Sequence, residues 1–138
     1  MRFLDTNILV RYLTGDDPQK AQASFELLVR VERGEEPVVT TDLVIAETVF
    51  VLQSKSYSLS RDRIRELVEP VIEMRGLRLP QKSLYYRVFD LYCQKRISFT
   101  DAYNAAYMAS QGLTEIYSYD TDFVRIESVV RVEPGAEE

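Results

Sequence analysis

Five short apolar segments alternate with longer stretches of helical periodicity, and this alternation limits the fold of the chain more than any other feature. The segments are residues 2–4, 38–40, 77–79, 116–119 and 129–132. Segments of this length and composition predict strands. Because helices separate them, the connections have to cross the sheet and leave the strands parallel. We therefore predict an α/β fold, a three-layer α/β/α sandwich with a short parallel sheet.

Residues that favour helix starts precede the helical stretches. They are Thr6 with Asn7, Asp17 before Pro18, Asp42, Ser60, and a last start near Thr100. We expect Pro70 to kink or split the helix that begins at Ser60. The helix over residues 43–52 is apolar almost all round, which predicts that it is buried.

The composition predicts one domain without a membrane segment. The 138 residues are 46% hydrophobic, enough for one compact core but not comfortably for two. We expect a single domain over residues 1–133 and a flexible tail over 134–138. No stretch is long and apolar enough to cross a bilayer, and the start lacks the order of a signal peptide, so we expect a cytoplasmic protein. Cys93, the only cysteine, is expected to be a small core residue.

The charges exclude several kinds of function. The chain has no histidine, which rules out histidine-dependent triads and histidine-ligated zinc sites. The net charge of −5 argues against a module held on nucleic acid chiefly by many phosphate contacts. Cations still cluster locally, which is compatible with a basic rim. The clusters are Arg61, Arg63 and Arg65, and Lys95 with Arg96.

Glu47 is the most informative carboxylate, because it is the only charge between Asp42 and Lys55 in an otherwise apolar run. Burying it unpaired would be costly. A salt bridge to an arginine, or a helix face more exposed than expected, would explain it without any chemistry. A metal-ligand role is the alternative that we favour.

Other carboxylates also have ordinary explanations. Asp5 follows the first strand, Asp101 lies three residues after Ser98 at a helix start, and Asp120 and Asp122 follow a later strand. Acids at such positions often form turns or cap helices.

Four separate segments nevertheless each contribute a carboxylate, namely Asp5, Glu47, Asp101 and Asp120. Gathered without cations, these groups would repel one another and their pKa values would rise. Mg²⁺ and Mn²⁺ prefer oxygen ligands and also bind substrate phosphates. We therefore predict a Mg²⁺ or Mn²⁺ site for phosphodiester hydrolysis, and leave open how many ions it holds and which carboxylate orients the attacking water.

The chain resembles the PIN-domain nucleases, and within them the VapC-type toxins of toxin–antitoxin pairs. The resemblance spans roughly residues 3–132, which would make residues 1–133 one PIN-like nuclease domain. It rests on four motifs taken together: residues 3–9 (FLDTNIL), the helix that carries Glu47, residues 98–102 (SFTDA) and residues 118–123 (SYDTDF).

The resemblance implies a metal-dependent endoribonuclease whose catalytic and metal-binding quartet is Asp5, Glu47, Asp101 and Asp120. Thr6, Ser118 and Asp122 would be supporting polar neighbours, and we favour Asp120 over Asp122 as the fourth ligand. The resemblance also implies homodimers, an RNA substrate, and an antitoxin whose C-terminal segment covers the acidic groove, often with an arginine.

Other functions compete with this one. A catalytically silent domain that only binds proteins is disfavoured by the four intact acidic positions. A phosphohydrolase with Asp5 as nucleophile is disfavoured because Asn7 stands where a second aspartate is usual. A housekeeping RNA-processing enzyme of the same fold stays open, and a neighbouring antitoxin gene would separate it from a toxin.

Overall fold

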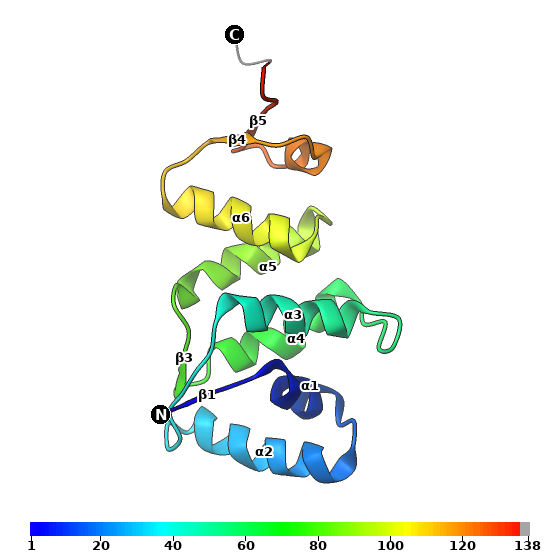
Figure 1. Cartoon of the computed structure of the whole chain (residues 1–138), viewed down its shortest axis with the longest axis vertical. Helices are drawn as coiled ribbons and strands as arrows, with labels where there is room; N and C mark the ends of the chain where they lie inside the picture. The colour runs from blue at the N-terminus through cyan, green and yellow to red at the C-terminus, as the bar shows by residue number, and fades with distance from the viewer. Residues whose placement is uncertain (136–138) are drawn as a thin grey trace. The chain divides into compact units, whose positions relative to one another are not determined.

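Two compact units make up the chain, Met1–Lys82 and the part from Ser83 onward, and each is described by itself (Figure 1). The structure, a computed structural model, describes residues 1–135. Residues 136–138 of the predicted flexible tail lie outside the described residues. No helix within residues 1–135 is long and apolar enough to cross a membrane.

The first unit contains a three-stranded parallel sheet in the order β1-β2-β3. The strands are β1 (Arg2–Phe3), β2 (Val38–Val39) and β3 (Leu77–Arg78). Arg2 pairs with Val38, and Val38 pairs with Leu77. The helices are α1 (Thr6–Thr14), α2 (Pro18–Glu32), α3 (Asp42–Gln53) and α4 (Arg61–Ile72). Helix α1 contacts α2 and α3, and α3 contacts α4.

The second unit contains two packed helices and a two-stranded parallel sheet. Its elements are α5 (Tyr85–Gln94), α6 (Phe99–Ser110), β4 (Glu115–Tyr117), the 3₁₀ helix η2 (Thr121–Arg125) and β5 (Val130–Val132). A short 3₁₀ helix, η1 (Lys82–Leu84), spans the boundary between the units. All five predicted strands are confirmed to within a residue or two at each end, and every pairing is parallel as predicted.

Helix starts follow the predicted capping residues with two corrections. Helix α1 begins at Thr6 with Asp5 at the N-cap position, so Thr6 and Asn7 are not its capping residues. The side chains of Asp17 and Ser60 accept hydrogen bonds from the backbone N–H groups of Lys20 and Arg63. Thr41 rather than Asp42 caps α3, because its hydroxyl accepts from Val44 N–H while Asp42 is already helical. The charge of Asp42 still complements the helix dipole from the first turn.

The predicted split at Pro70 is wrong, since α4 is one element through Ile72 with Pro70 inside it. Pro70 is exposed and stands two residues before the helix ends. At that position a proline removes only one backbone hydrogen bond near a terminus, and solvent can satisfy the freed carbonyl.

The predicted all-round burial of α3 is also wrong. Val44, Ile45, Val49 and their neighbours on one face are buried, whereas Leu43 is 81% and Phe50 75% exposed. A run of apolar residues without periodicity does not indicate which face of a helix is packed, and here only one face is.

Thr40 joins the ends of β1 and β2 inside the first unit. Its hydroxyl donates a hydrogen bond of 2.8 Å to the carbonyl of Leu4, and both residues are buried. The backbone N–H of Leu4 donates to Val39, and that of Thr40 donates to Arg78. Since Asp5 follows Leu4 directly, these bonds fix the backbone from which the Asp5 carboxylate extends.

Thr40→Val is expected to lower the free energy of unfolding by about 1–3 kcal/mol, because it leaves the buried Leu4 carbonyl without its hydroxyl partner. Thr48→Val is the matched control, since Thr48 is equally buried and donates to Val44, whose carbonyl also accepts a helical N–H. Urea denaturation should show the larger loss for Thr40→Val. Equal losses of unfolding free energy would mean that the hydrogen bond from Thr40 to Leu4 stabilises the fold no more than the one from Thr48 to Val44.

Candidate metal site

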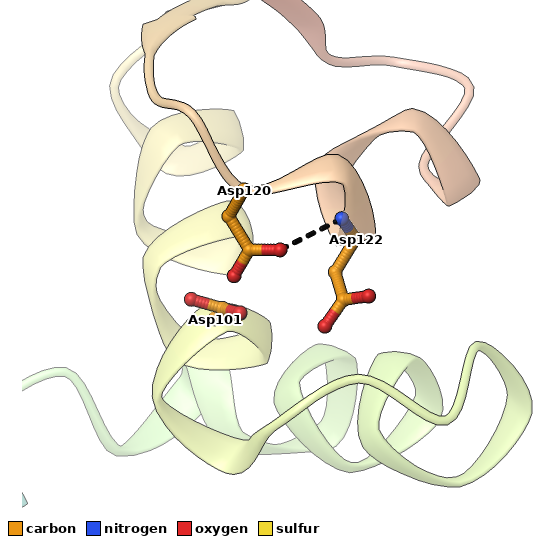
Figure 2. Close-up of side chains that lie close together, drawn as sticks. All are labelled: Asp101, Asp120 and Asp122. Atoms are coloured by element: carbon orange, nitrogen blue, oxygen red, sulfur yellow. Dashed lines mark hydrogen bonds between the residues drawn. The ribbon is translucent and has the colours of Figure 1, made fainter.

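The second unit brings three aspartates together, Asp101 from α6 and Asp120 and Asp122 from the turn into η2 (Figure 2). One carboxylate oxygen of each lies within 4.8 Å of the corresponding oxygens of the other two. We call these three residues the aspartate trio. Asp101 and Asp122 are half-buried, and Asp120 is exposed.

Asp101 is positioned by the start of α6. Ser98 is the N-cap, and its hydroxyl accepts a hydrogen bond of 3.1 Å from the backbone N–H of Asp101. Phe99, the first helical residue, is buried with ring centroids 5.6 Å from Phe89 and 5.7 Å from Tyr92. The aromatic packing therefore holds the first turn against α5, and the cap sets the backbone of Asp101. The capping role that the sequence suggested for this segment thus coexists with a place in the trio.

Asp120 and Asp122 are gathered by a turn. The hydroxyl of Ser118 accepts from the backbone N–H of Asp120 at 3.0 Å, and Asp120 Oδ1 accepts from the backbone N–H of Asp122 at 2.9 Å. Arg131 of β5 donates to the carbonyl of Ser118 at 3.1 Å, which ties the turn to the sheet. The turn-forming interpretation of these acids is therefore right, and the same turn places their carboxylates next to Asp101.

The pKa of Asp101 is raised above its ordinary value. Burial of the carboxylate is the largest cause, and the negative charges of Asp120 and Asp122 act in the same direction, while a hydrogen bond with Ser98 opposes them. Both causes disfavour the ionised form. A cation bound between these side chains would remove the repulsion.

The donor set fits Mg²⁺ or Mn²⁺. All three side chains offer hard carboxylate oxygens, which these ions prefer over nitrogen or sulfur ligands. Two oxygens bound to one Mg²⁺ at about 2.1 Å lie at most about 4.2 Å apart, so roughly 0.6 Å of side-chain movement suffices. The trio therefore suits a small divalent cation.

Asp5, Glu47 and Thr6 lie in the first unit. Asp5 is exposed at the N-cap position of α1, where its side chain makes no capping hydrogen bond. Its carboxylate is therefore not used as a helix cap, contrary to the ordinary explanation for an acid at this turn. Thr6 is 4% exposed, and its hydroxyl has no hydrogen-bond partner among residues 1–135. The grouping of Asp5 and Glu47 with Asp101 and Asp120 stays a prediction.

Glu47 is exposed, so its predicted burial is wrong for the same reason as that of α3. In the described part of the chain it forms no salt bridge, so pairing with an arginine does not explain its presence. The more exposed helix face, which explains Glu47 without any chemistry, is therefore confirmed, and its metal-ligand role stays a prediction.

Sequence reasoning missed Arg125. Its guanidinium lies 3.8 Å from Asp122 Oδ1 and also contacts the loop between α5 and α6. The spacing of three residues between Asp122 and Arg125 is the signal that would have indicated the pair, because such residues are neighbours on a helical turn.

Short parallel strands with helices between them define an α/β protein. Its candidate divalent-metal site is formed by acidic residues that follow a strand and begin a helix. A family model described as PIN domain matches residues 2–129. The chain therefore belongs to the PIN domain family. This confirms the resemblance and the PIN-like α/β fold class expected from the sequence.

Two known proteins are similar to the chain. The chain is 23% identical over 126 residues to a VapC ribonuclease from Aquifex aeolicus (strain VF5), with 91% of this chain and 92% of that protein covered. It is 20% identical to Mycobacterium tuberculosis VapC20, whose crystal structure is described as that of a Sarcin-Ricin loop cleaving toxin. The match to VapC20 covers 97% of this chain and all of that one, with a TM-score of 0.42.

Asp101→Asn is expected to raise the melting temperature of the metal-free protein by a few degrees at neutral pH, because it removes a carboxylate whose pKa is raised by burial and repulsion. The penalty is present above the raised pKa and vanishes as the pH falls below the ordinary value near 4. The stability difference between variant and wild type should therefore shrink on acidification.

Asp62→Asn is the matched control, because Asp62 is also an acid in the first turn of a helix but lies in the other unit. That change should lower the melting temperature slightly, since only a favourable dipole interaction is lost. Thermal melts in EDTA from about pH 4 to pH 8 make the comparison. A lower melting temperature for Asp101→Asn would contradict the repulsion argument.

Proposed function

We propose that this PIN-domain protein is a metal-dependent endoribonuclease that hydrolyses RNA phosphodiester bonds, and that it is the toxin of a type II toxin–antitoxin pair. The strongest support is the aspartate trio. One carboxylate oxygen of each residue lies within 4.8 Å of those of the other two, and Arg125 is paired with Asp122 alone. Membership of the PIN family and similarity to a VapC ribonuclease point to the same chemistry.

In the proposed site, Asp5, Glu47, Asp101 and Asp120 would hold Mg²⁺ or Mn²⁺, and Asp122 would be their supporting neighbour. When bound, the divalent cation neutralises phosphate charge and lowers the pKa of a coordinated water. One of the carboxylates orients the attacking water by accepting its hydrogen bond. Thr6 and Ser118 support Asp5 and Asp120, Ser118 by its hydrogen bond to the turn.

The proposed partners follow from the same acidic site. An antitoxin segment that inserts an arginine would pair with the trio through charge-assisted hydrogen bonds and exclude the metal ion. We further propose that the toxin is a cytoplasmic homodimer, as the VapC resemblance implies.

Cleavage of a panel of structured and single-stranded RNAs tests the proposed function. With Mg²⁺ or Mn²⁺ the wild type should cut at least one RNA, and EDTA should abolish cutting. Asp5→Asn and Asp101→Asn should each lower the rate by about 100-fold or more, because each removes a charge that acts on the transition state. Asp62→Asn should retain the wild-type rate.

Other outcomes would favour the alternatives. Metal-independent cutting that both site variants retain would indicate a contaminant or another mechanism. No cutting by folded, metal-loaded protein would favour a silent protein-binding domain. Activity without a co-purifying small partner when the chain is expressed with its genomic neighbours would favour a housekeeping nuclease.

Asp120→Asn is expected to weaken Mn²⁺ binding by about 10-fold or more, and Asp122→Asn by less, because Arg125 already offsets part of the charge of Asp122. Asparagine keeps an oxygen at position 120 that can still accept from the N–H of Asp122, so the turn is preserved. Calorimetric titration with MnCl₂ measures both affinities. A larger loss for Asp122→Asn would make Asp122 the fourth ligand.

A further inference from the structure

Arg125 lies beside the aspartate trio in the second unit and contacts the backbone of the loop that carries Lys95 and Arg96. Lys95 and Arg96 follow α5 in the loop that leads to Ser98 and α6. Arg125, at the end of η2, donates weak hydrogen bonds of 3.5 and 3.4 Å to their carbonyls, and its other terminal nitrogen lies 3.8 Å from Asp122 Oδ1. The guanidinium thus connects the loop before Asp101 with the helix that carries Asp122.

The side chains of these cations are available for a ligand. Arg96 is exposed, the side chain of Arg125 is 55% exposed, and Lys95 is half-buried. Within residues 1–135, neither Lys95 nor Arg96 forms a salt bridge. Only Arg125 has an acidic partner, at a distance long enough for the pair to be weak.

Arg96 adopts a backbone conformation that its side chain disfavours. Its φ is +55°, in the left-handed region that glycine adopts without strain. The turn between α5 and α6 would therefore be formed more easily by glycine. The turn itself therefore does not require the long cationic side chain of Arg96.

Lys95, Arg96 and Arg125 carry three positive charges, the sign that attracts the phosphodiester groups of a nucleic acid backbone. Two of the three cations are arginines, whose planar guanidinium binds phosphate oxygens in pairs.

We propose that Lys95, Arg96 and Arg125 form a phosphate-binding rim that holds the RNA backbone next to the bond to be cut. The proposal rests on the proposed function and adds its substrate contact. The ligand is the phosphodiester backbone of single-stranded RNA on either side of that bond, bound regardless of base identity.

The test uses Lys95→Gln, Arg96→Gly and Arg125→Gln in the full chain with Mn²⁺. Each variant should raise KM for a fluorescein-labelled single-stranded RNA several-fold and leave kcat closer to the wild-type value. In the Asp5→Asn background, anisotropy should show weaker RNA binding. The plot of log affinity against log salt should become less steep by about 0.7 for each cation removed.

Two comparisons make the result specific. Arg87→Gln removes one exposed charge from α5, eight residues before Lys95, and should leave KM and the salt slope unchanged. Arg125→Lys should restore part of the affinity because it keeps the charge. Arg96→Gly should weaken RNA binding while the melting temperature stays equal or rises, which a structural role for Arg96 would not produce.

The outcomes separate this inference from the proposed function. If the wild type cuts RNA in a metal-dependent way but Lys95→Gln and Arg96→Gly keep its KM and salt slope, the phosphate-binding rim is contradicted and the proposed function stands. If the wild type with Mn²⁺ neither binds nor cuts RNA, both proposals fail. If poly-L-glutamate binds through the three cations but single-stranded RNA does not, the rim binds an acidic protein segment instead.

Discussion

Repulsion among Asp101, Asp120 and Asp122 is the constraint on which the rest of the second unit depends. Each carboxylate is positioned through a hydroxyl or a backbone N–H, at Ser98, at Ser118 and in the bond from Asp122 N–H to Asp120. Such bonds fix geometry without neutralising charge. The negative charge that repels in the metal-free protein is therefore kept for binding a cation.

Packing supplies the energy that opposes this repulsion. Buried aromatic residues of α5 and α6, Tyr85, Phe89, Tyr92 and Phe99, form one cluster beneath the first turn of α6. Their burial stabilises the unit by several kilocalories per mole on the scale of about 1.5–3 kcal/mol per large apolar side chain. An acidic site that lowers stability is tolerated because this neighbouring core is well packed.

The sequence predicted the elements better than their exposure. Strands such as residues 38–40 could be located because β-branched apolar residues lie between capping residues and turns, which is local information. The exposure of Glu47 could not be predicted, since the apolar run around it has no periodicity to show which face packs. Asp122 was predicted only as a neighbour of the site, because a spacing of two residues does not reveal that the Asp120 carboxylate folds the turn onto it. The contact of Arg125 with the loop before α6 spans about thirty residues, which single-sequence patterns do not contain, whereas its pair with Asp122 could have been predicted from their spacing of three residues.

On the proposed function, activity and inhibition use the same charges. A divalent cation and an arginine inserted by a partner both stabilise the trio by offsetting its repulsion, so each binds less well when the other is present. The rim adds a second competition, because an acidic segment and an RNA backbone would both be attracted to Lys95, Arg96 and Arg125. A partner that brings an arginine to the trio and acids to the rim would therefore displace the metal ion and the substrate together. The opposed charges of these two adjacent groups are what would let one protein segment switch the enzyme off.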